Sequence, residues 1–193
     1  PLFYPEAPMR CDLHKFPGRG PLYDGRTHKY LNMEMALQKS SNVYVARLML
    51  GVVDRLGADW YRDQLENIFG FGVKSGVELP YENGGFVPKP GALYSAGQLQ
   101  WSLPTPVSLS MGYNLLVNSV QMARAFSVFA NGGYLVSPTL VKKVATQEGE
   151  EVDFPLNHAE RARVLSPAIC SQIVKAMRFV TKKGGIGMQG DVY

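Results

Sequence analysis

The sequence predicts an α+β chain in which helices outnumber strands. Apolar residues recur at helical spacing in several segments, capping residues and glycines bound those segments, and one stretch carries the valine, leucine and threonine content of a strand. The 193 residues are enough for one core of ordinary size and too few for two comfortable domains. The composition, 46% hydrophobic and 19% charged, is that of a globular chain.

Caps and breakers set the limits of the expected elements. Asn32 and Asp59 suit the N-caps of the first and third helices, and Gly57 ends the second helix. Ser166 followed by Pro167 is the strongest helix start in the chain. We expect helices over residues 33–39, 43–56, 59–69, 119–131 and 166–182, a strand over 134–145, and loops over 1–31 and 70–100.

Two of these helices are described further by how apolar residues are distributed around them. The helix over 43–56 is apolar nearly all the way round, which is typical of a buried central helix. In the helix over 119–131, one face consists of Val120, Ala123, Phe126, Ser127 and Ala130.

Charge and composition exclude several functions. The net charge is +4, but the 20 Lys and Arg residues are scattered, whereas nucleic-acid binders concentrate theirs on one face. No apolar stretch reaches the roughly 20 residues that span a bilayer. Cys11 and Cys170 lack Cys-x-x-Cys spacing, and His14, His28 and His158 are scattered. We therefore expect no nucleic-acid partner, no metal and no cofactor.

Ser40-Ser41-Asn42 is the candidate for chemistry. With 12 serines and 8 asparagines, about half a Ser-x-Asn occurrence is expected by chance, so the motif alone is a weak signal. Its setting between a short helix and an apolar helix would hold hydroxyl and amide groups on rigid elements, which suits a proton relay. The alternative is that Ser41 or Asn42 simply caps the following helix.

The motif and its neighbours resemble the class B penicillin-binding proteins, the monofunctional peptidoglycan transpeptidases. The resemblance covers roughly residues 30–187, in the order and spacing of that family. It runs through 37–44 (LQKSSNVY), 69–72 (FGFG), 75–82 (SGVELPYE), 112–114 (GYN), 121–126 (QMARAF), 130–133 (ANGG) and 180–187 (VTKKGGIG). Where the family usually has Thr-Pro, this chain has Asn118-Ser119, which we expect to affect capping only.

The resemblance implies roles for individual residues. Ser40 would be the relay hydroxyl, and Asn42 would bind the acyl amide of the substrate and help to position the lysine that activates the nucleophile. Ser41 is the variable middle residue and receives no role.

Two further motifs of the family are not found. No Ser-x-x-Lys occurs in the chain, so the nucleophilic serine is expected before Pro1. The third motif, Lys-[Thr/Ser]-Gly, is expected beyond Tyr193. Lys74-Ser75-Gly76 matches its pattern but lies in a Gly/Pro-rich loop, and we interpret it as a decoy.

Residues 1–193 are thus expected to form a partial transpeptidase domain: mostly the helical part of the penicillin-binding fold, with part of the central sheet missing. The chain alone should not be acylated. Because strands would be missing, we hypothesise that it is stable only with partner strands, engineered ends or self-association, and near-ultraviolet circular dichroism would reveal a molten state.

The resemblance implies a parent protein that cross-links peptidoglycan stem peptides, is acylated by β-lactam antibiotics and works with division or elongation proteins of cell-wall synthesis. It implies a bacterial inner-membrane anchor with the domain on the periplasmic or extracytoplasmic side. A serine β-lactamase of the same fold is one alternative. Hydrolysis of the acyl-enzyme would identify such an enzyme. A β-lactam sensor or a non-catalytic scaffold is another alternative. Loss of the Ser or Lys of Ser-x-x-Lys would favour the scaffold, whereas a retained motif with stable acylation but no transfer would favour the sensor.

Overall fold

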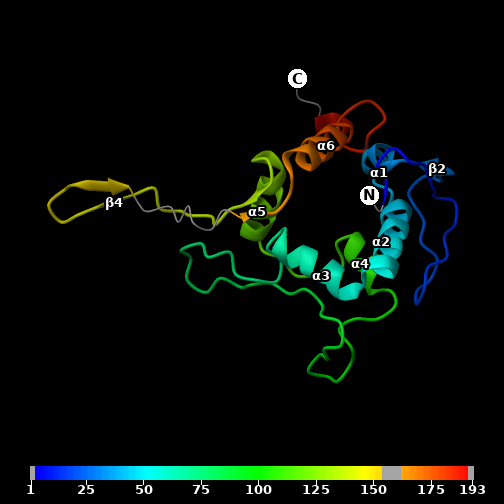
Figure 1. Ribbon diagram of the computed structural model, residues 1–193, viewed down its shortest axis with the longest axis horizontal. Helices are drawn as coiled ribbons and strands as arrows, with labels where there is room; N and C mark the ends of the chain where they lie inside the picture. Colours follow the sequence, from blue (N-terminus) through cyan, green and yellow to red (C-terminus); the bar gives the residue numbers. More distant parts are fainter. Residues whose placement is uncertain (1–2, 154–161, 191–193) are drawn as a thin grey trace. The chain divides into compact units, whose positions relative to one another are not determined.

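The structure is a computed structural model that describes residues 3–153 and 162–190 (Figure 1). Its elements follow the order β1 (Met9–Arg10), β2 (Tyr30–Leu31), α1 (Met33–Lys39), α2 (Asn42–Leu56), α3 (Ala58–Asn67), α4 (Thr105–Ser110), α5 (Ser119–Ala130), β3 (Tyr134–Leu135), β4 (Lys143–Ala145), β5 (Glu151–Asp153), β6 (Ala162–Arg163), α6 (Pro167–Arg178) and a 3-10 helix (Met188–Gly190). The described strands pair as three two-stranded antiparallel sheets, β1 with β2, β3 with β6 and β4 with β5. The predicted α+β class, mostly helical, is confirmed.

The chain divides into two compact units. The first comprises Pro1–Asp63, Pro88–Leu115 and Ser171–Tyr193, and the second comprises Gln64–Val87 and Leu116–Cys170. Each unit has its own buried side chains and is described by itself. Among the described residues, no helix is both long and apolar enough to cross a membrane.

The core of the first unit forms around the start of α2. Its buried cluster consists of Cys11, Phe16, Leu22, Leu31, Ala36, Val43, Tyr44, Ala46 and Val107. Helix α2 packs against α4, which contributes Val107. Tyr61 and Trp101 add an edge-to-face ring pair with centroids 6.3 Å apart. Apolar burial of this kind, more than intrinsic helix propensity, stabilises the helices of this unit.

The second unit centres on α5. Gln121 is completely buried, and its Nε2 donates to the carbonyl oxygens of Val73 and Gly84, each at 2.7 Å. Asn118 and Gln121 form a reciprocal capping box at the helix start. Asn118 therefore serves capping, as expected at the position where the family has Thr-Pro.

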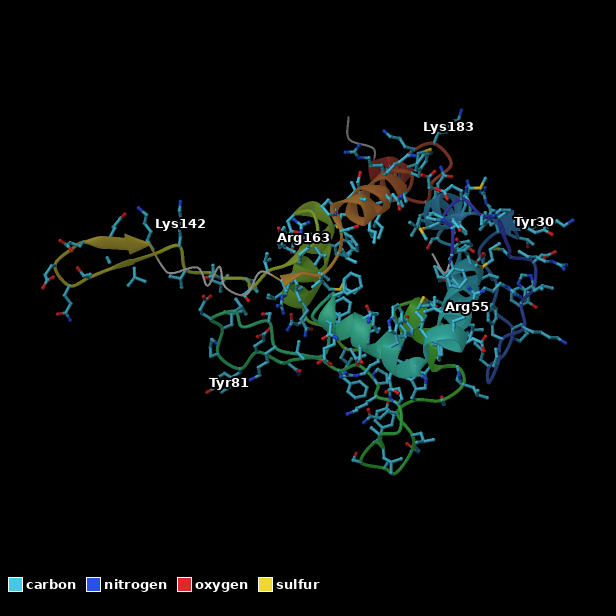
Figure 2. The ribbon with its side chains drawn as sticks, in the orientation of Figure 1. Tyr30, Arg55, Tyr81, Lys142, Arg163 and Lys183 are labelled. Atoms are coloured by element: carbon cyan, nitrogen blue, oxygen red, sulfur yellow. The ribbon has the colours of Figure 1, made fainter. Side chains whose placement is uncertain are left out.

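Gly133 follows the end of α5, and close approach of the backbone requires glycine at this position. Its φ is +104°, and a Cβ atom there would lie 1.9 Å from the Leu165 carbonyl oxygen. The chain therefore passes so close to itself that only glycine fits. Nearby, Arg163 lies over the Tyr134 ring at 4.1 Å and donates to its hydroxyl at 2.5 Å. Arg163 is labelled in Figure 2.

Several predicted boundaries are confirmed. Helix α1 begins after the Asn32 cap, whose side chain accepts from the Met35 N–H, and α2 ends at Gly57 with φ +90°. Ser166 Oγ accepts from the Ile169 N–H, as expected of a capping serine. His158 falls outside the described residues.

Other boundaries were wrong. Helix α3 begins at Ala58, so Asp59 lies in its first turn and not at the cap, because Gly57 already breaks α2 and supplies the first carbonyl. Helix α6 ends at Arg178, four residues before Lys182, in tighter turns such as Val180 N–H to Met177 carbonyl.

The strand and loop predictions need correction too. The single strand expected over 134–145 is split into β3 and β4, each with a different partner, because strand limits depend on pairing as well as composition. Residues 1–31, expected to be irregular, contain β1 and β2. The short α4 was not predicted. Its Thr105 is buried, and Pro106 occupies the first turn.

The buried face of α5 is not the face that the sequence analysis singled out. The buried side chains are Gln121, Ala125 and Val128, whereas Phe126 is 52% exposed. Glutamine is a polar residue type, so the apolar pattern of the sequence does not indicate that the face containing Gln121 is buried. Its burial depends on hydrogen bonds to a distant loop. Helix α2 buries Val43 and Val52 but leaves much of its length half-buried.

Candidate active-site junction

Helix α1 ends in a Schellman turn at Ser40. The Ser40 N–H donates to the Leu37 carbonyl oxygen at 3.1 Å, and the Ser41 N–H donates to that of Ala36 at 2.9 Å. Ser40 has φ +51° and ψ +52°, a left-handed conformation that glycine usually takes at this position. A serine there stores backbone strain, which is often found at functional sites.

Helix α2 begins immediately afterwards, with Ser41 as its N-cap. The Ser41 hydroxyl accepts a hydrogen bond from the Tyr44 N–H at 3.1 Å and donates one to Asp24 Oδ2 at 2.5 Å. Asp24 Oδ1 accepts from the Val43 N–H at 3.0 Å. The capping alternative is thus confirmed for Ser41, which is buried. Asn42 is the first residue of the helix.

Ser40 and Asn42 present their side chains to solvent on either side of this buried cap. Within residues 3–153 and 162–190, neither the Ser40 hydroxyl nor the Asn42 amide has a hydrogen-bond partner. A hydroxyl can both give and take a proton, and an amide offers a donor and an acceptor at fixed positions. The junction therefore places two available polar groups on a rigid backbone.

A glycine-containing turn from the C-terminal part of the chain contacts the end of α1. Gln38 Nε2 donates to the Lys183 carbonyl oxygen at 3.2 Å, and the Ile186 N–H donates to the Gln38 carbonyl oxygen at 3.1 Å. Lys39 Nζ donates to the Gly184 carbonyl oxygen at 2.6 Å. Two segments 145 residues apart in sequence are therefore held side by side next to Ser40.

Glycine is required in this turn by close approach of the backbone. A Cβ atom at Gly185 would lie 2.1 Å from the Val180 carbonyl oxygen and 2.6 Å from that of Phe179. Gly184 has φ +85°, which a side chain rarely adopts. The turn can thus keep its shape only with both glycines.

A cavity of about 540 Å³ lies between the turn and the loop that follows Asp24. It is lined by Gly25, Arg26, His28, Lys39, Gly184, Gly185, Ile186 and Met188. Arg26 and Lys39 contribute positive charge, and none of the described residues that line it is acidic, so this lining favours an anionic group.

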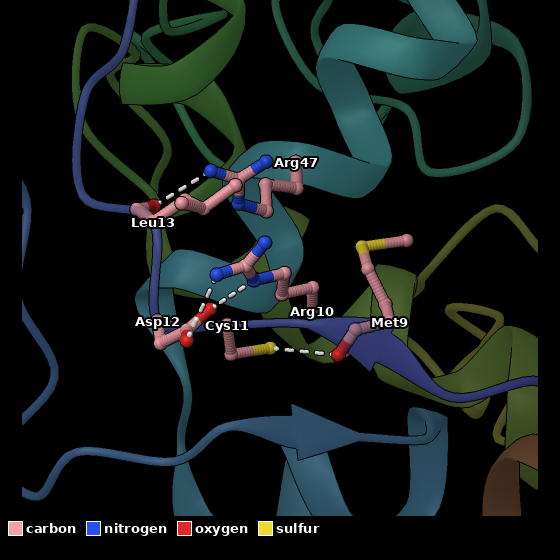
Figure 3. A network of polar contacts seen from close by, with 6 residues as sticks. All are labelled: Met9, Arg10, Cys11, Asp12, Leu13 and Arg47. Carbon is pink, nitrogen blue, oxygen red and sulfur yellow. Dashed lines mark hydrogen bonds and ion pairs between the residues drawn. The ribbon is translucent and has the colours of Figure 1, made fainter.

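Cys11 is buried close to Asp24 and Ser41 of the junction. Its thiol is 1% exposed and donates to the Met9 carbonyl oxygen at 3.3 Å (Figure 3). Burial raises the pKa of the Cys11 thiol, and the nearby Asp24 carboxylate raises it further. Cys11 is therefore a protonated, buried neighbour of the cap and is poorly suited to act as a nucleophile.

The segment that follows β1 and contains Cys11 is tied to α2. Arg47 Nη2 donates to the Leu13 carbonyl oxygen at 2.7 Å (Figure 3). The Arg47 guanidinium also lies 5.5 Å from the centre of the Phe16 ring. Arg10 and Asp12 form an exposed ion pair at 2.6 Å in the same view, which contributes little to stability. In the described part of the chain, no group of three or more His, Cys, Asp or Glu side chains is arranged to hold a metal.

A family model described as "Penicillin binding protein transpeptidase domain" matches residues 18–192. The chain belongs to this family. The match spans the junction, the capping aspartate and the glycine-containing turn. The resemblance to penicillin-binding protein transpeptidases seen in the sequence is thus confirmed.

Curated relatives of the transpeptidase family carry related names. Penicillin-binding protein PbpB of Mycobacterium tuberculosis is 32% identical over 151 residues, covering 78% of this chain and 20% of the relative. A probable peptidoglycan D,D-transpeptidase, PbpC of Pseudomonas aeruginosa, is 29% identical over 161 residues, covering 83% and 24%. The chain thus spans about a fifth to a quarter of the length of these two relatives.

Solved transpeptidase structures share the fold. Penicillin-binding protein 3 of Mycobacterium tuberculosis, complexed with aztreonam, matches with a TM-score of 0.79 at 26% identity. The match covers 99% of this chain and 41% of that one. The transpeptidase domain of Burkholderia pseudomallei penicillin-binding protein 3 gives 0.74 at 18% identity, covering 97% and 50%. The penicillin-binding fold is confirmed, and the chain carries mostly its helical part.

For a transpeptidase-family chain, the sequence located the motif but missed part of its setting. Ser40 and Asn42 lie together at the junction, and Ser41 has a structural role that was only one of two alternatives. Asp24 was not predicted. An aspartate followed by Gly25 indicates only a turn in sequence.

Lys74-Ser75-Gly76, interpreted as a decoy, lies outside the strands of the described chain. Ser75 is buried, and its N–H donates to both carboxylate oxygens of Glu82, at 2.9 and 3.0 Å. Burial acts to raise the pKa of Glu82, but hydrogen bonds from Ser75, Asn118 and Gly76 outweigh it and lower that pKa. These contacts give the segment a structural role in its loop.

Proposed function

We propose that this chain is part of the catalytic domain of a serine-type peptidoglycan D,D-transpeptidase. Ser40 is the hydroxyl that relays a proton, and Asn42 binds the acyl amide of the stem peptide and helps to position the activating lysine. The nucleophilic serine and that lysine belong to a Ser-x-x-Lys motif outside residues 1–193, and the carboxylate-binding Lys-[Thr/Ser]-Gly motif lies beyond Tyr193. Residues 1–193 are accordingly a partial domain that is not acylated alone.

One observation carries the proposal. The junction exposes a hydroxyl at Ser40 and an amide at Asn42 beside a tightly held turn, and a buried cap between them fixes their backbone. Groups on rigid elements keep the alignment that proton transfer needs. Membership of the transpeptidase family and the names of the relatives support the reaction class.

The chemistry follows from the weakness of a serine hydroxyl as a nucleophile. A lysine removes the proton of the attacking serine, the serine oxygen bonds to the carbonyl carbon of a D-Ala-D-Ala stem, and the terminal D-Ala leaves as an amine. Ser40 delivers the proton that this amine needs. An acceptor amine from a second stem then attacks the acyl ester, forms the cross-link and returns the serine. A β-lactam would acylate the same serine.

The same proposal includes the setting of the whole protein. It is anchored in a bacterial inner membrane, with the domain on the extracytoplasmic side, and works with the division or elongation proteins of cell-wall synthesis. Membership of the penicillin-binding transpeptidase family motivates this setting.

Intact-mass spectrometry after exposure to benzylpenicillin tests the proposal. The longer protein that contains this chain should gain one stable adduct on a serine outside residues 1–193, whereas the chain alone should gain none. In the longer protein, Ser40→Ala and Asn42→Ala should slow acylation by about 100-fold. Ser95→Ala, at an exposed loop serine, should leave the rate unchanged.

Each other outcome points elsewhere. An adduct on the chain alone would contradict the missing nucleophile. No adduct on either protein would favour a non-catalytic scaffold, and a stable adduct without transfer to an acceptor amine would favour a β-lactam sensor. Rapid release of the adduct as hydrolysed drug would indicate a β-lactamase.

A further inference from the structure

The Asp24 carboxylate joins two parts of the junction with its two oxygens. Oδ2 accepts from the Ser41 hydroxyl at 2.5 Å, and Oδ1 accepts from the Val43 N–H at 3.0 Å. Asp24 comes from the loop between β1 and β2, 17 residues before Ser41. The contact is therefore tertiary and not part of local helix capping.

The two contacts exceed what α2 needs for a cap. Ser41 already caps the helix, since its hydroxyl oxygen accepts from the Tyr44 N–H. Asp24 adds a negative charge at the positive end of the helix and accepts the hydrogen bond that the Ser41 hydroxyl donates. The Ser41 side chain is thus fixed in one rotamer between a carboxylate and a backbone amide.

Fixing Ser41 also fixes its two neighbours. The Ser41 N–H closes the Schellman turn by donating to Ala36, and this turn keeps Ser40 in its left-handed conformation. On the other side, Asn42 stands between the cap and Val43, whose N–H is held by the same carboxylate. A shift of Ser41 would therefore move both the hydroxyl and the amide that face solvent.

We propose that Asp24 is a positioning residue for the acyl-transfer reaction, acting through the hydroxyl of Ser41. The middle residue of the Ser-x-Asn motif then has a definite requirement, which is a hydroxyl that donates to Asp24 while it accepts from the helix. This inference rests on the proposed function, because it assigns Ser40 and Asn42 to the reaction.

The test is made in the longer protein, with the rate of acylation by a fluorescent penicillin split into a dissociation constant and an acylation rate constant. Asp24→Asn replaces one acceptor oxygen by a donor and should reduce the acylation rate constant by about 10-fold to 100-fold. Ser41→Ala should have a similar effect, and Ser41→Thr should restore most of the rate because it keeps the hydroxyl. The double variant Asp24→Asn with Ser41→Ala should be no slower than the worse single variant.

Asp59→Asn is the matched control, because it makes the same chemical change in the first turn of α3, at an exposed aspartate. Equal rates for Asp24→Asn and Asp59→Asn, or additive effects in the double variant, would overturn the role of Asp24. If Asp24→Asn does not fold, Ser41→Ala decides, since it removes the same hydrogen bond from the other partner. Absence of acylation in the unsubstituted protein would instead overturn the proposed function, and the role of Asp24 in the reaction with it.

Discussion

Lys39 and Gly184 join the end of α1 to the glycine-containing turn beside the candidate active-site junction. The Lys39 ammonium donates to the Gly184 carbonyl oxygen at 2.6 Å, one residue before the strained Ser40. The neighbouring Ile186 N–H donates to the Gln38 carbonyl oxygen. Because Gln38 Nε2 also donates to the Lys183 carbonyl oxygen, the turn is held by two side-chain contacts and one backbone contact from adjacent residues of α1.

Removing the ammonium should loosen this turn. Lys39→Met keeps much of the side-chain length but cannot donate, so the amide of Ile186 should exchange with deuterium faster in the chain of 193 residues. The free energy of unfolding should fall by no more than about 1 kcal/mol, because the contact is exposed. Lys142→Met, at an exposed residue, is the control. Unchanged exchange at Ile186 would mean that the two contacts of Gln38 hold the turn without the ammonium.

The strain at Ser40 predicts opposite effects on stability and reaction. Ser40→Gly and Ser40→Ala both remove the hydroxyl, but only glycine relieves the left-handed conformation at φ +51°. The glycine variant should be more stable than the alanine variant by about 1 kcal/mol in urea unfolding. In the longer protein both should acylate slowly. Equal stabilities would show that the turn relaxes around a side chain.

Gln121 should be one of the costliest positions in the second unit. Gln121→Leu would leave the Val73 and Gly84 carbonyl oxygens without their donor and would break the capping box with Asn118. We expect a loss of about 3 kcal/mol in the free energy of unfolding. Gln172→Leu, at an exposed position of α6, should change it by less than about 0.5 kcal/mol. A small effect at Gln121 would indicate that water replaces the amide.

Cys11 should resist alkylation in the folded chain. Because the pKa of its thiol is raised above the ordinary value of 9.0, the folded chain holds the proton at pH values where an unfolded cysteine begins to ionise. The associated stability is complete below the ordinary thiol pKa and is lost as the pH rises through the raised one.

Iodoacetamide labelling in a Cys170→Ala background measures this directly. At pH 8 the folded chain should react more slowly than the same chain in urea, and the difference should shrink at strongly alkaline pH. Equal rates at pH 8 would argue against a buried thiol beside Asp24.

The hypothesis that the chain needs partner strands or self-association stays a prediction. Exposed apolar side chains such as Met35, Phe126 and Ile169 are compatible with it. A sharp, concentration-independent unfolding transition of the monomer would count against it.

The sequence by itself determined the features that depend on neighbours along the chain. Asn32, Gly57 and Ser166 act within three or four residues, so their capping roles were predictable from residue type. The order and spacing of the motif around Ser40 and Asn42 also indicated the family correctly.

Tertiary structure alone decided the contacts between distant residues. Asp24 reaches Ser41 across 17 residues, Lys39 reaches Gly184 across 145, and Gln121 reaches Val73 across 48. Each of these polar groups would be expected in solvent from its residue type, and each finds a partner only after the chain has folded. A buried or bridging polar group is stable only where a partner replaces water, and sequence patterns carry no record of that partner.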